Sequence, residues 1–71
     1  MAYTVQNIIA TLRQERGLRQ EDVAEAVEVS RQTMSALEKG SYVPSLLLAF
    51  RLAHYFDVTV EKLFRLEEVI K

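Results

Sequence analysis

Three consecutive polar residues, Arg31, Gln32 and Thr33, follow Ser30 in this chain. Serine is a good helix N-cap, because its hydroxyl can accept a hydrogen bond from the free amides of the next turn. The sequence therefore predicts a helix that begins at Arg31, with these side chains in its first turn. Arginine can donate two hydrogen bonds to guanine, and glutamine can both donate to and accept from adenine. The chemistry open to such a set is recognition of DNA base edges.

Two short helices joined by a tight turn, residues 20–39, are the elements that must position this set. In the first helix Val23 and Val27 lie at helical spacing with polar residues on the other side, which indicates one apolar face. In the second helix Met34 and Leu37 lie three residues apart and can pack inward. Helices joined by so short a turn must cross steeply, which is the geometry of the helix-turn-helix. Its second helix fits the major groove, with its N-terminal residues nearest the bases.

The composition indicates one small globular domain. The chain has 71 residues, of which 49% are hydrophobic. This length predicts a single domain over residues 1–71 that buries only about 60% of its unfolded surface, so we expect modest stability or help from a partner. No apolar run approaches the roughly 20 residues that span a bilayer, and the N-terminus lacks a secretion signal. A cytoplasmic protein without membrane contact is expected.

Catalysis and metal binding have little support in the sequence. There is no cysteine, and His54 is the only histidine. Glycine-rich phosphate loops and carboxylate pairs at catalytic spacing are also missing. A lone histidine is far more often a surface residue than a ligand. We therefore expect no enzyme, no metal, no cofactor and no small-molecule ligand.

The net charge of -1 argues mildly against nucleic acid, because phosphate contacts supply much of the affinity for DNA. The placement of charge matters more than its sum. Arg16, Arg19, Arg31 and Lys39 fall at the edges of the predicted motif, which favours DNA at that surface.

The segment from Leu12 to Phe56 resembles the lambda-repressor-like, or XRE-type, helix-turn-helix family. The matching features are LR-x-x-R-G-L-x-Q, the VA of the first motif helix, the V-S-R-Q-T turn and helix start, L-E-K-G and P-S-L. The resemblance implies a compact all-α domain of five helices that binds DNA. One feature departs from the family: its motif turn usually carries glycine, and here the residue is Glu28. A non-glycine residue adopts positive φ only at some cost.

The expected DNA contacts fall into two groups. Base contacts are expected from the second motif helix: Arg31, Gln32, Thr33, Ser35 and Ala36. Ala36 stands where relatives often carry a longer polar residue, so it can offer only an apolar contact. Phosphate contacts are expected from the edges of the motif and from the loop after it: Arg19, Gln20, Lys39, Ser41 and Tyr42. The loop contacts are implied by the resemblance, and Tyr42 could equally pack its ring against the loop.

Arg13 by itself would be a solvated charge on a helix. The resemblance implies instead that Arg13 pairs with Glu38 at the end of the second motif helix. Such a structural ion pair would tie the first helix of the chain to the recognition helix, and removing one partner of a buried pair is costly.

The two ends of the chain leave alternatives open. The spacing of Val5, Ile8, Ile9 and Leu12 predicts a first helix that begins near Val5, with Thr4 as a cap. Residues 2–5 could equally be an extended arm. At the other end, a last helix is predicted after Thr59, and residues 65–71 either continue it or form an extended arm that pairs with residues 2–5.

Apolar residues at a chain end are usually buried against something. Within the helix predicted over residues 46–56, Leu47 and Tyr55 are expected to be partly exposed, and two such side chains do not make an interface. We predict instead that the terminal segment, residues 60–71, forms a two-fold dimer contact through five apolar side chains: Leu63, Phe64, Leu66, Val69 and Ile70.

The sequence thus predicts a sequence-specific regulator of transcription that binds double-stranded DNA. A homodimer would place two recognition helices about 34 Å apart on a roughly palindromic operator, and repression by occupancy is the expected action. The alternative is a protein-interaction module, such as an antitoxin or the partner of another regulator, which uses the same fold and its apolar tail on another protein.

Overall fold

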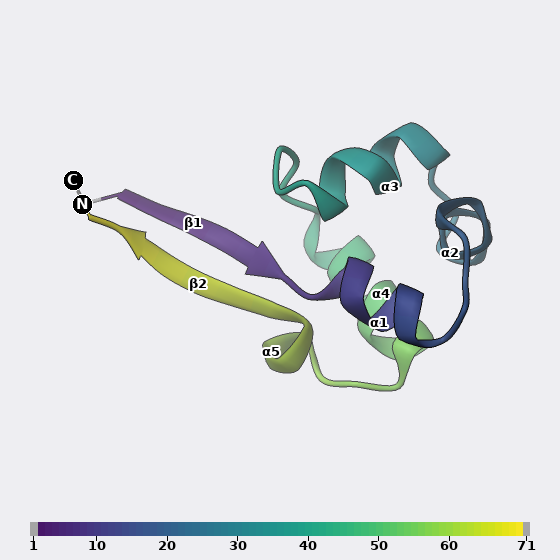
Figure 1. The fold of residues 1–71 in the computed structure, drawn as a ribbon. Coiled ribbons are helices and arrows are strands. Elements are labelled where there is room, and N and C mark those ends of the chain that lie inside the picture. The colour runs from purple at the N-terminus through teal and green to yellow at the C-terminus, as the bar shows by residue number, and fades with distance from the viewer. Residues whose placement is uncertain (1, 71) are drawn as a thin grey trace.

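The computed structural model describes residues 2–70; Met1 and Lys71, which the predicted domain and terminal segment included, lie outside the described residues. A helical body carries a two-stranded arm that projects from one side (Figure 1). The elements in chain order are β1 (Ala2–Asn7), α1 (Ile9–Glu15), α2 (Gln20–Ala26), α3 (Arg31–Glu38), α4 (Leu46–Phe56), α5 (Val60–Leu63) and β2 (Phe64–Val69).

Local sequence signals define three of the helix starts. The hydroxyl oxygens of Ser30, Ser45 and Thr59 each accept a hydrogen bond from the backbone amide three residues later. Each of these residues thus satisfies one of the amides left without a partner at a helix start. At the end of α3, Gly40 has a φ of 80°, a conformation that glycine adopts without steric penalty. The positions of α3, α4 and α5 therefore follow from local chemistry.

The core lies between the helices of the body. Met34, Leu37, Leu52 and Phe56 are fully buried there. Ala24 is also buried, at 2% exposure, where α2 and α3 cross. Burial of these side chains removes apolar surface from water and fixes the position of α3 on the body.

The prediction that helix 1 begins near Val5 is wrong. Val5 lies in β1, and α1 begins only at Ile9. The N-cap position is Ile8, and the amide of Ile9 donates to Oδ1 of Asn7 at 3.1 Å, so Asn7 rather than Thr4 supplies the side-chain acceptor at the start of α1. The apolar spacing suggested one helix, but Val5 lies in β1, whereas Ile9 and Leu12 lie in α1.

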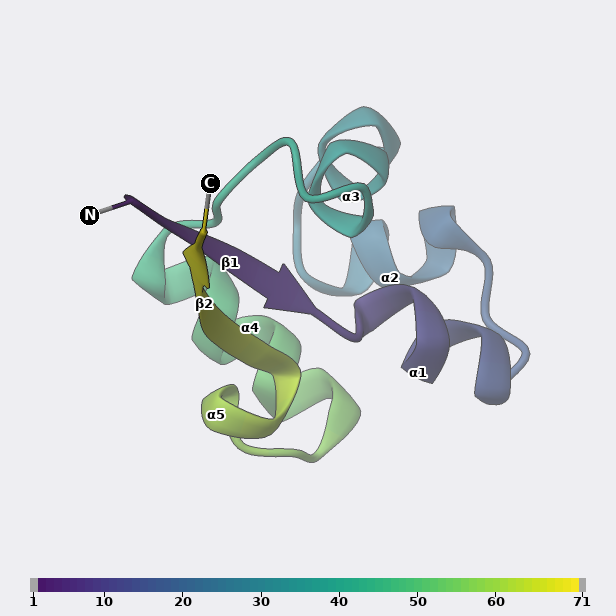
Figure 2. The same ribbon diagram turned by 60° about the vertical axis from the view of Figure 1, so that its left-hand side comes forward.

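The all-α class also needs correction, since β1 and β2 form an antiparallel sheet with the register from Ala2↔Val69 to Asn7↔Phe64. The chain ends were predicted either to be helical or to form paired extended arms, and the structure shows the paired arms. Figures 1 and 2 show both strands leaving the body together, with the two chain ends at the tip. We refer to β1 and β2 together as the arm.

The two faces of the arm differ in character, because side chains alternate along a strand and directly paired residues share a face. One face carries Tyr3, Val5, Leu66 and, at the base, Phe64, with Glu68 opposite Tyr3 near the tip and Asn7 opposite Phe64. Phe64 packs against the core cluster. The apolar face of the arm thus continues outward from the core, without a covering element along its outer half among the described residues.

Candidate nucleic-acid interface

The recognition helix α3 exposes the side chains predicted to contact bases and buries those predicted to anchor it. Met34 and Leu37 have no exposed surface. Arg31 and Gln32, in the first turn, are exposed, and Ser35 and Ala36 are partly exposed. The structure therefore brings these polar groups to one surface, with the N-terminal turn of α3 available to a partner.

Thr33 has a second role in the cap of α3. Its amide donates to Oγ of Ser30 at 3.0 Å, and its hydroxyl oxygen accepts from the Ser30 hydroxyl at 3.0 Å. The threonine hydroxyl can still donate, since a hydroxyl carries one donor and two acceptor sites. Thr33 is thus held in a fixed orientation at the start of the helix.

The other end of α3 is held by charged and polar side chains from α1 and α2. Nε of Arg13 donates to Oε2 of Glu38 at 2.7 Å, and Nη2 of Arg13 donates to Oε1 at 3.1 Å. The side chains of Arg13 and Glu38 are only 14% and 7% exposed. This hydrogen bonding from Glu38 raises the pKa of Arg13, although burial opposes the shift. The expected ion pair is therefore present, bidentate and largely buried.

Gln20, predicted to hold a phosphate, lies beside this pair. Its Nε2 donates to Oε1 of Glu38 at 3.0 Å. A glutamine amide has two N–H donors and a carbonyl acceptor, so one donor remains available. Gln20 also begins α2, where the partial positive charge of the helix start favours an anion.

Arg19, also predicted to contact phosphate, already has two acidic partners. Its Nη1 lies 2.9 Å from Oε1 of Glu21, and its Nη2 lies 3.2 Å from Oδ1 of Asp22. The hydrogen bonds from the side chain and backbone of Arg19 lower the pKa of Asp22. Any phosphate contact by Arg19 would compete with these exposed ion pairs.

The turn between α2 and α3 has the backbone conformation that glycine favours, with a different residue in place. Glu28 has a φ of 64°. The next amide, that of Val29, donates to the Ala24 carbonyl at 2.9 Å, which closes the turn. The carboxylate of Glu28 lies 3.2 Å from Nη1 of Arg51 on α4. The departure from glycine therefore leaves the motif intact at the cost of an unfavourable φ.

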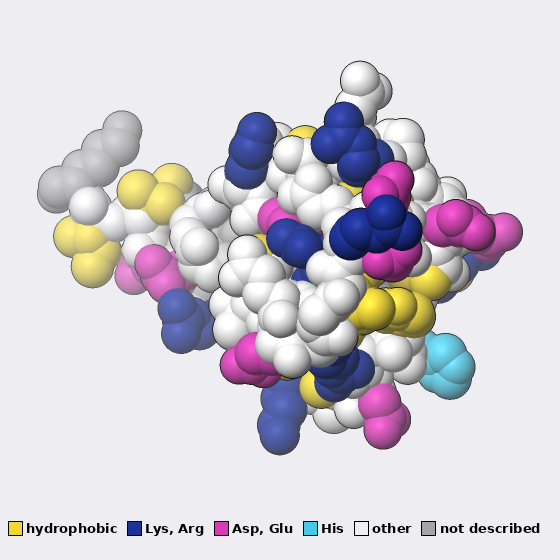
Figure 3. All heavy atoms as spheres, turned by 45° about the vertical axis from the view of Figure 1, so that its right-hand side comes forward, with side chains coloured by type: hydrophobic (Ala, Val, Ile, Leu, Met, Phe, Trp, Pro, Cys, Tyr) yellow, Lys and Arg dark blue, Asp and Glu magenta, His cyan; other side chains and the backbone are white. Residues whose placement is uncertain are grey.

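The loop after α3 presents the remaining predicted phosphate contacts. Lys39 and Ser41 are exposed, and Tyr42 is 41% exposed. The hydroxyl of Ser41 donates to the Ala36 carbonyl at 3.2 Å. On the side of the molecule that Figure 3 brings forward, Lys and Arg side chains are spread across the surface with acidic side chains beside several of them. The positive charge at the motif is thus local and partly neutralised.

Two side chains have structural roles that sequence reasoning missed. Nη2 of Arg16 donates to the Phe56 carbonyl at 2.7 Å, and its guanidinium carbon lies 5.3 Å from the centre of the Phe56 ring. Nδ2 of Asn7 donates to the Leu37 carbonyl at 2.9 Å. The asparagine ahead of the apolar run was a usable cap signal, whereas the contacts with Phe56 and Leu37 depend on the tertiary fold.

The predicted dimer residues divide between core and surface. Leu63 is fully buried in its own chain and Phe64 packs against the core, so Leu63 is wrong as an interface residue. Its four-residue helix turns the side chain inward. Leu66 is 65% exposed, Val69 43% and Ile70 87%, so these three remain available.

A second apolar surface lies at the start of α4. Val43, Leu46, Leu47 and Phe50 are between 56% and 71% exposed. Leu46, Leu47 and Phe50 lie at helical spacing along one face of α4, and Val43 lies in the loop just before the helix. The predicted partial exposure is confirmed for both Leu47 and Tyr55, although Tyr55 also packs against the core with part of its side chain. We call these four residues the α4 stripe.

Other kinds of site gain no support from the part of the chain that the structure describes. His54 is exposed, as expected of a surface histidine. Residues 2–70 contain no cluster of three His, Cys, Asp or Glu side chains suited to a metal ion. In the same range, no helix has the length and apolar character needed to cross a membrane.

Comparison with known proteins gives consistent results. The helix-turn-helix family model HTH_3 matches residues 9–69. The chain is 47% identical over 64 residues to YgzD, an uncharacterised HTH-type transcriptional regulator of Bacillus subtilis, covering 90% of this chain and 97% of that protein. These matches include both motif helices and the body that supports them.

Solved structures show the same fold. A protein of Bacteroides fragilis described as a candidate DNA-binding protein superimposes with a TM-score of 0.78 at 22% identity. The match covers 87% of this chain and all of that chain. The restriction-modification controller protein C.AhdI of Aeromonas hydrophila superimposes with a TM-score of 0.70 at 28% identity, covering 76% and 82%.

Proposed function

Because the chain belongs to the XRE-type helix-turn-helix family of transcriptional regulators, we propose that it recognises a specific double-stranded DNA operator through α3. The observation that carries this proposal is the first turn of α3, where Arg31 and Gln32 are exposed on a helix anchored by the buried Met34. Both side chains can form paired hydrogen bonds with a purine in the major groove. Thr33, Ser35 and Ala36 complete the proposed base-contacting surface.

Phosphate contacts would fix the position of α3 on the duplex. Gln20, at the start of α2, retains one free N–H donor beside its bond to Glu38. Lys39, Ser41 and Tyr42 add donors from the far end of α3 and its loop. Arg19 contributes long-range attraction, because its charge is shared with two acidic neighbours. Such contacts set affinity and position rather than sequence preference.

We further propose a homodimer that binds a two-fold symmetric operator. A two-stranded ribbon alone is marginally stable in water and needs a third element against it. Leu66, on the apolar face of β2, is 65% exposed, which supports contact with a second copy of the same surface. Val69, on the opposite face, and Ile70, just after β2, are also exposed. A dimer doubles the phosphate contacts, which offsets the weak net charge of each subunit.

Repression is the action that a protein of this kind supports best. The matched family model includes both motif helices, so DNA binding would be the means of control. A dimer bound across a promoter in the cytoplasm would exclude polymerase by occupancy.

The α4 stripe favours one alternative function. Three apolar side chains along one face of α4, with Val43 from the preceding loop, form a surface of the type that binds another protein. In that case the chain would be an interaction module, and substitution of Gln32 would have no effect on its activity.

Selection from a random duplex library at two salt concentrations tests the proposal. We expect enrichment of a two-fold symmetric site, with an affinity that falls steeply as salt rises because counterions are released from the phosphates. Failure of the folded protein to enrich any sequence at low salt would contradict the DNA-binding proposal and support the interaction module.

A further inference from the structure

The side chain of Asn7 joins the arm to the recognition helix by a hydrogen bond. Asn7 is the last residue of β1, where it pairs with Phe64 at the base of the arm. Its Nδ2 donates to the Leu37 carbonyl at 2.9 Å, and its Oδ1 accepts from the Ile9 amide at 3.1 Å. One side chain therefore joins the end of the arm, the start of α1 and the last turn of α3.

The acceptor in α3 lies in the last turn of the helix. The Leu37 carbonyl is among the last four of α3, which have no amide partner within the helix. It accepts from the Gly40 amide at 3.1 Å as well as from Asn7. Loss of the Asn7 bond would remove a direct link from the arm to this turn, while Arg13 and Gln20 would still hold the turn from α1 and α2 through Glu38.

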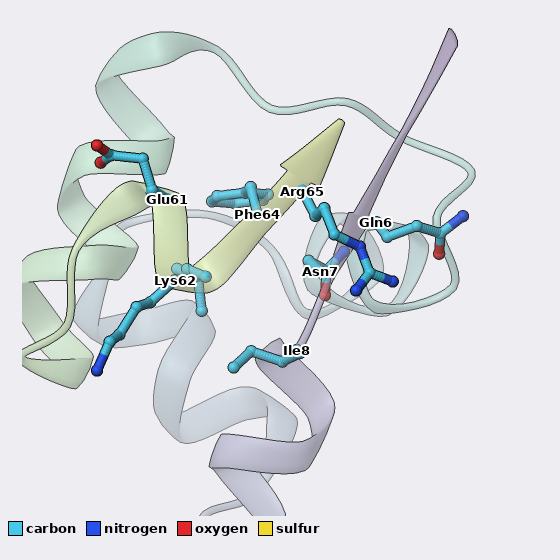
Figure 4. Close-up of a pocket in the computed structure, with 8 residues that line it drawn as sticks. Gln6, Asn7, Ile8, Glu61, Lys62, Phe64 and Arg65 are labelled. Carbon is cyan, nitrogen blue, oxygen red and sulfur yellow. The ribbon is translucent and has the colours of Figure 1, made fainter. Parts of the chain in front are cut away.

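The surroundings of Asn7 allow this bond to respond to the arm. Figure 4 shows Asn7 at the wall of an open hollow between β1, α5 and β2, close to Ile8 and Arg65. The backbone amide of Ile8 donates to the Leu63 carbonyl at 3.1 Å, so the junction is anchored to α5. A shift of the arm would move Asn7 relative to this anchor and to Leu37.

We infer that Asn7 is a positioning residue that couples the order of the arm to the placement of the recognition helix. This inference rests on the proposed function, in which the arm contacts a second copy and α3 contacts DNA. Contact with a partner that orders the arm stabilises the Asn7 bond, and this bond fixes the last turn of α3. By linkage, DNA that fixes α3 must stabilise the arm to the same degree.

The substitution Asn7→Asp removes this bond and places a carboxylate oxygen near the Leu37 carbonyl. Aspartate keeps an oxygen for the Ile9 amide at the start of α1, where a negative charge is favourable, but has no N–H for Leu37. Gln6→Glu is the matched control, since it adds the same charge on the opposite face of β1, across from Arg65. Asn7→Ser gives a third variant without added charge, whose shorter side chain can still cap α1 but cannot reach Leu37.

Hydrogen exchange in the free protein is the first measurement. We expect the amides of Gly40 and Ser41 to exchange about three- to tenfold faster in Asn7→Asp and Asn7→Ser than in the wild type, as the loss of one hydrogen bond implies, and to be unchanged in Gln6→Glu. Equal exchange rates in all four proteins would overturn the inference, whether or not the protein binds DNA.

Exchange with and without the selected duplex is the second measurement. Duplex binding should slow exchange of the β1 and β2 amides in the wild type and in Gln6→Glu, and should slow it about three- to tenfold less in Asn7→Asp. Equal slowing in Asn7→Asp would overturn the coupling while leaving DNA binding intact. Absence of binding by the wild type would instead contradict the proposed function, with the first measurement still deciding the role of Asn7.

Discussion

The last turn of α3 and the outer half of the arm differ in how fully their side chains are packed and hydrogen-bonded. The turn is held by Arg13, Gln20 and Asn7, and the Glu38 carboxylate there accepts three hydrogen bonds. The outer arm has its strands paired, but Leu66 and Ile70 expose most of their side chains. A DNA-binding helix must be rigid before its target arrives, whereas an assembly surface is completed only by its partner. The comparison indicates that the contacts of the last turn of α3 are complete within one chain, whereas those of the outer arm are not.

The largest effect on stability is expected at the ion pair between Arg13 and Glu38 in the last turn of α3. Glu38→Leu leaves the Arg13 guanidinium with little exposure and no carboxylate, which should destabilise the fold by about 2 to 4 kcal/mol. Chemical denaturation measures this change, with Glu15→Leu on the exposed end of α1 as control. A loss equal to that of the control would show that the pair is not structural.

Substitution in the arm should leave the fold intact and weaken assembly. Leu66→Asp places a charge on the apolar face and should raise the dimer dissociation constant about 30-fold or more, since burial of a leucine contributes about 1.5 to 3 kcal/mol. Sedimentation measures it, with Gln6→Asp on the other face of the arm as control.

Leu47→Asp distinguishes the arm from the α4 stripe in the same experiment. Dissociation caused by this variant, with Leu66→Asp still dimeric, would move the interface from the arm to α4. A wild-type protein that sediments only as a monomer would contradict the dimer at either surface.

A smaller effect of opposite sign is expected in the turn between α2 and α3. Glu28→Gly removes the unfavourable positive φ of a non-glycine residue and loses only an exposed pair with Arg51, so stability should rise by about 0.5 to 1 kcal/mol. Ala26→Gly, at the end of α2, should lower stability by about the same amount. Thermal unfolding compares the two, and destabilisation by Glu28→Gly would refute this account of the turn.

The smallest effect concerns Asp22, whose pKa is lowered by hydrogen bonds from Arg19. Because the folded pKa lies below the unfolded value, this interaction stabilises the protein at neutral pH and is lost as pH falls through the folded pKa. Asp22→Asn should therefore flatten the loss of thermal stability on acidification from about pH 5 to 2. An unchanged slope relative to the wild type would contradict the role of this pair.

Local chemistry explains which parts of the fold were predictable. Ser30 and Ser45 mark helix starts through bonds to amides three residues away, so the sequence nearby contains the whole signal. The start of α1 was mispredicted because Val5 fits a helical spacing, while its strand depends on Leu66, far away in the sequence. Pairing of distant segments gives no local periodicity.

The candidate site divides in the same way. Arg31 and Gln32 could be assigned to the exposed surface because Met34 and Leu37 define the buried face of a short helix. Leu63 was assigned wrongly, since an apolar residue near a chain end has the same pattern whether the core or a partner covers it. In α4, apolar residues surround the helix, so only the packed structure could show that Leu46 and Phe50 lie outside.

The most direct test of the central claim compares wild type and Gln32→Ala on the selected duplex and on a set in which each base pair is changed in turn. We predict that Gln32→Ala loses about 1 to 3 kcal/mol on the selected duplex and loses its preference at one base pair in each half-site, with other preferences retained. Equal affinities of the two proteins across the whole set would contradict base recognition by α3.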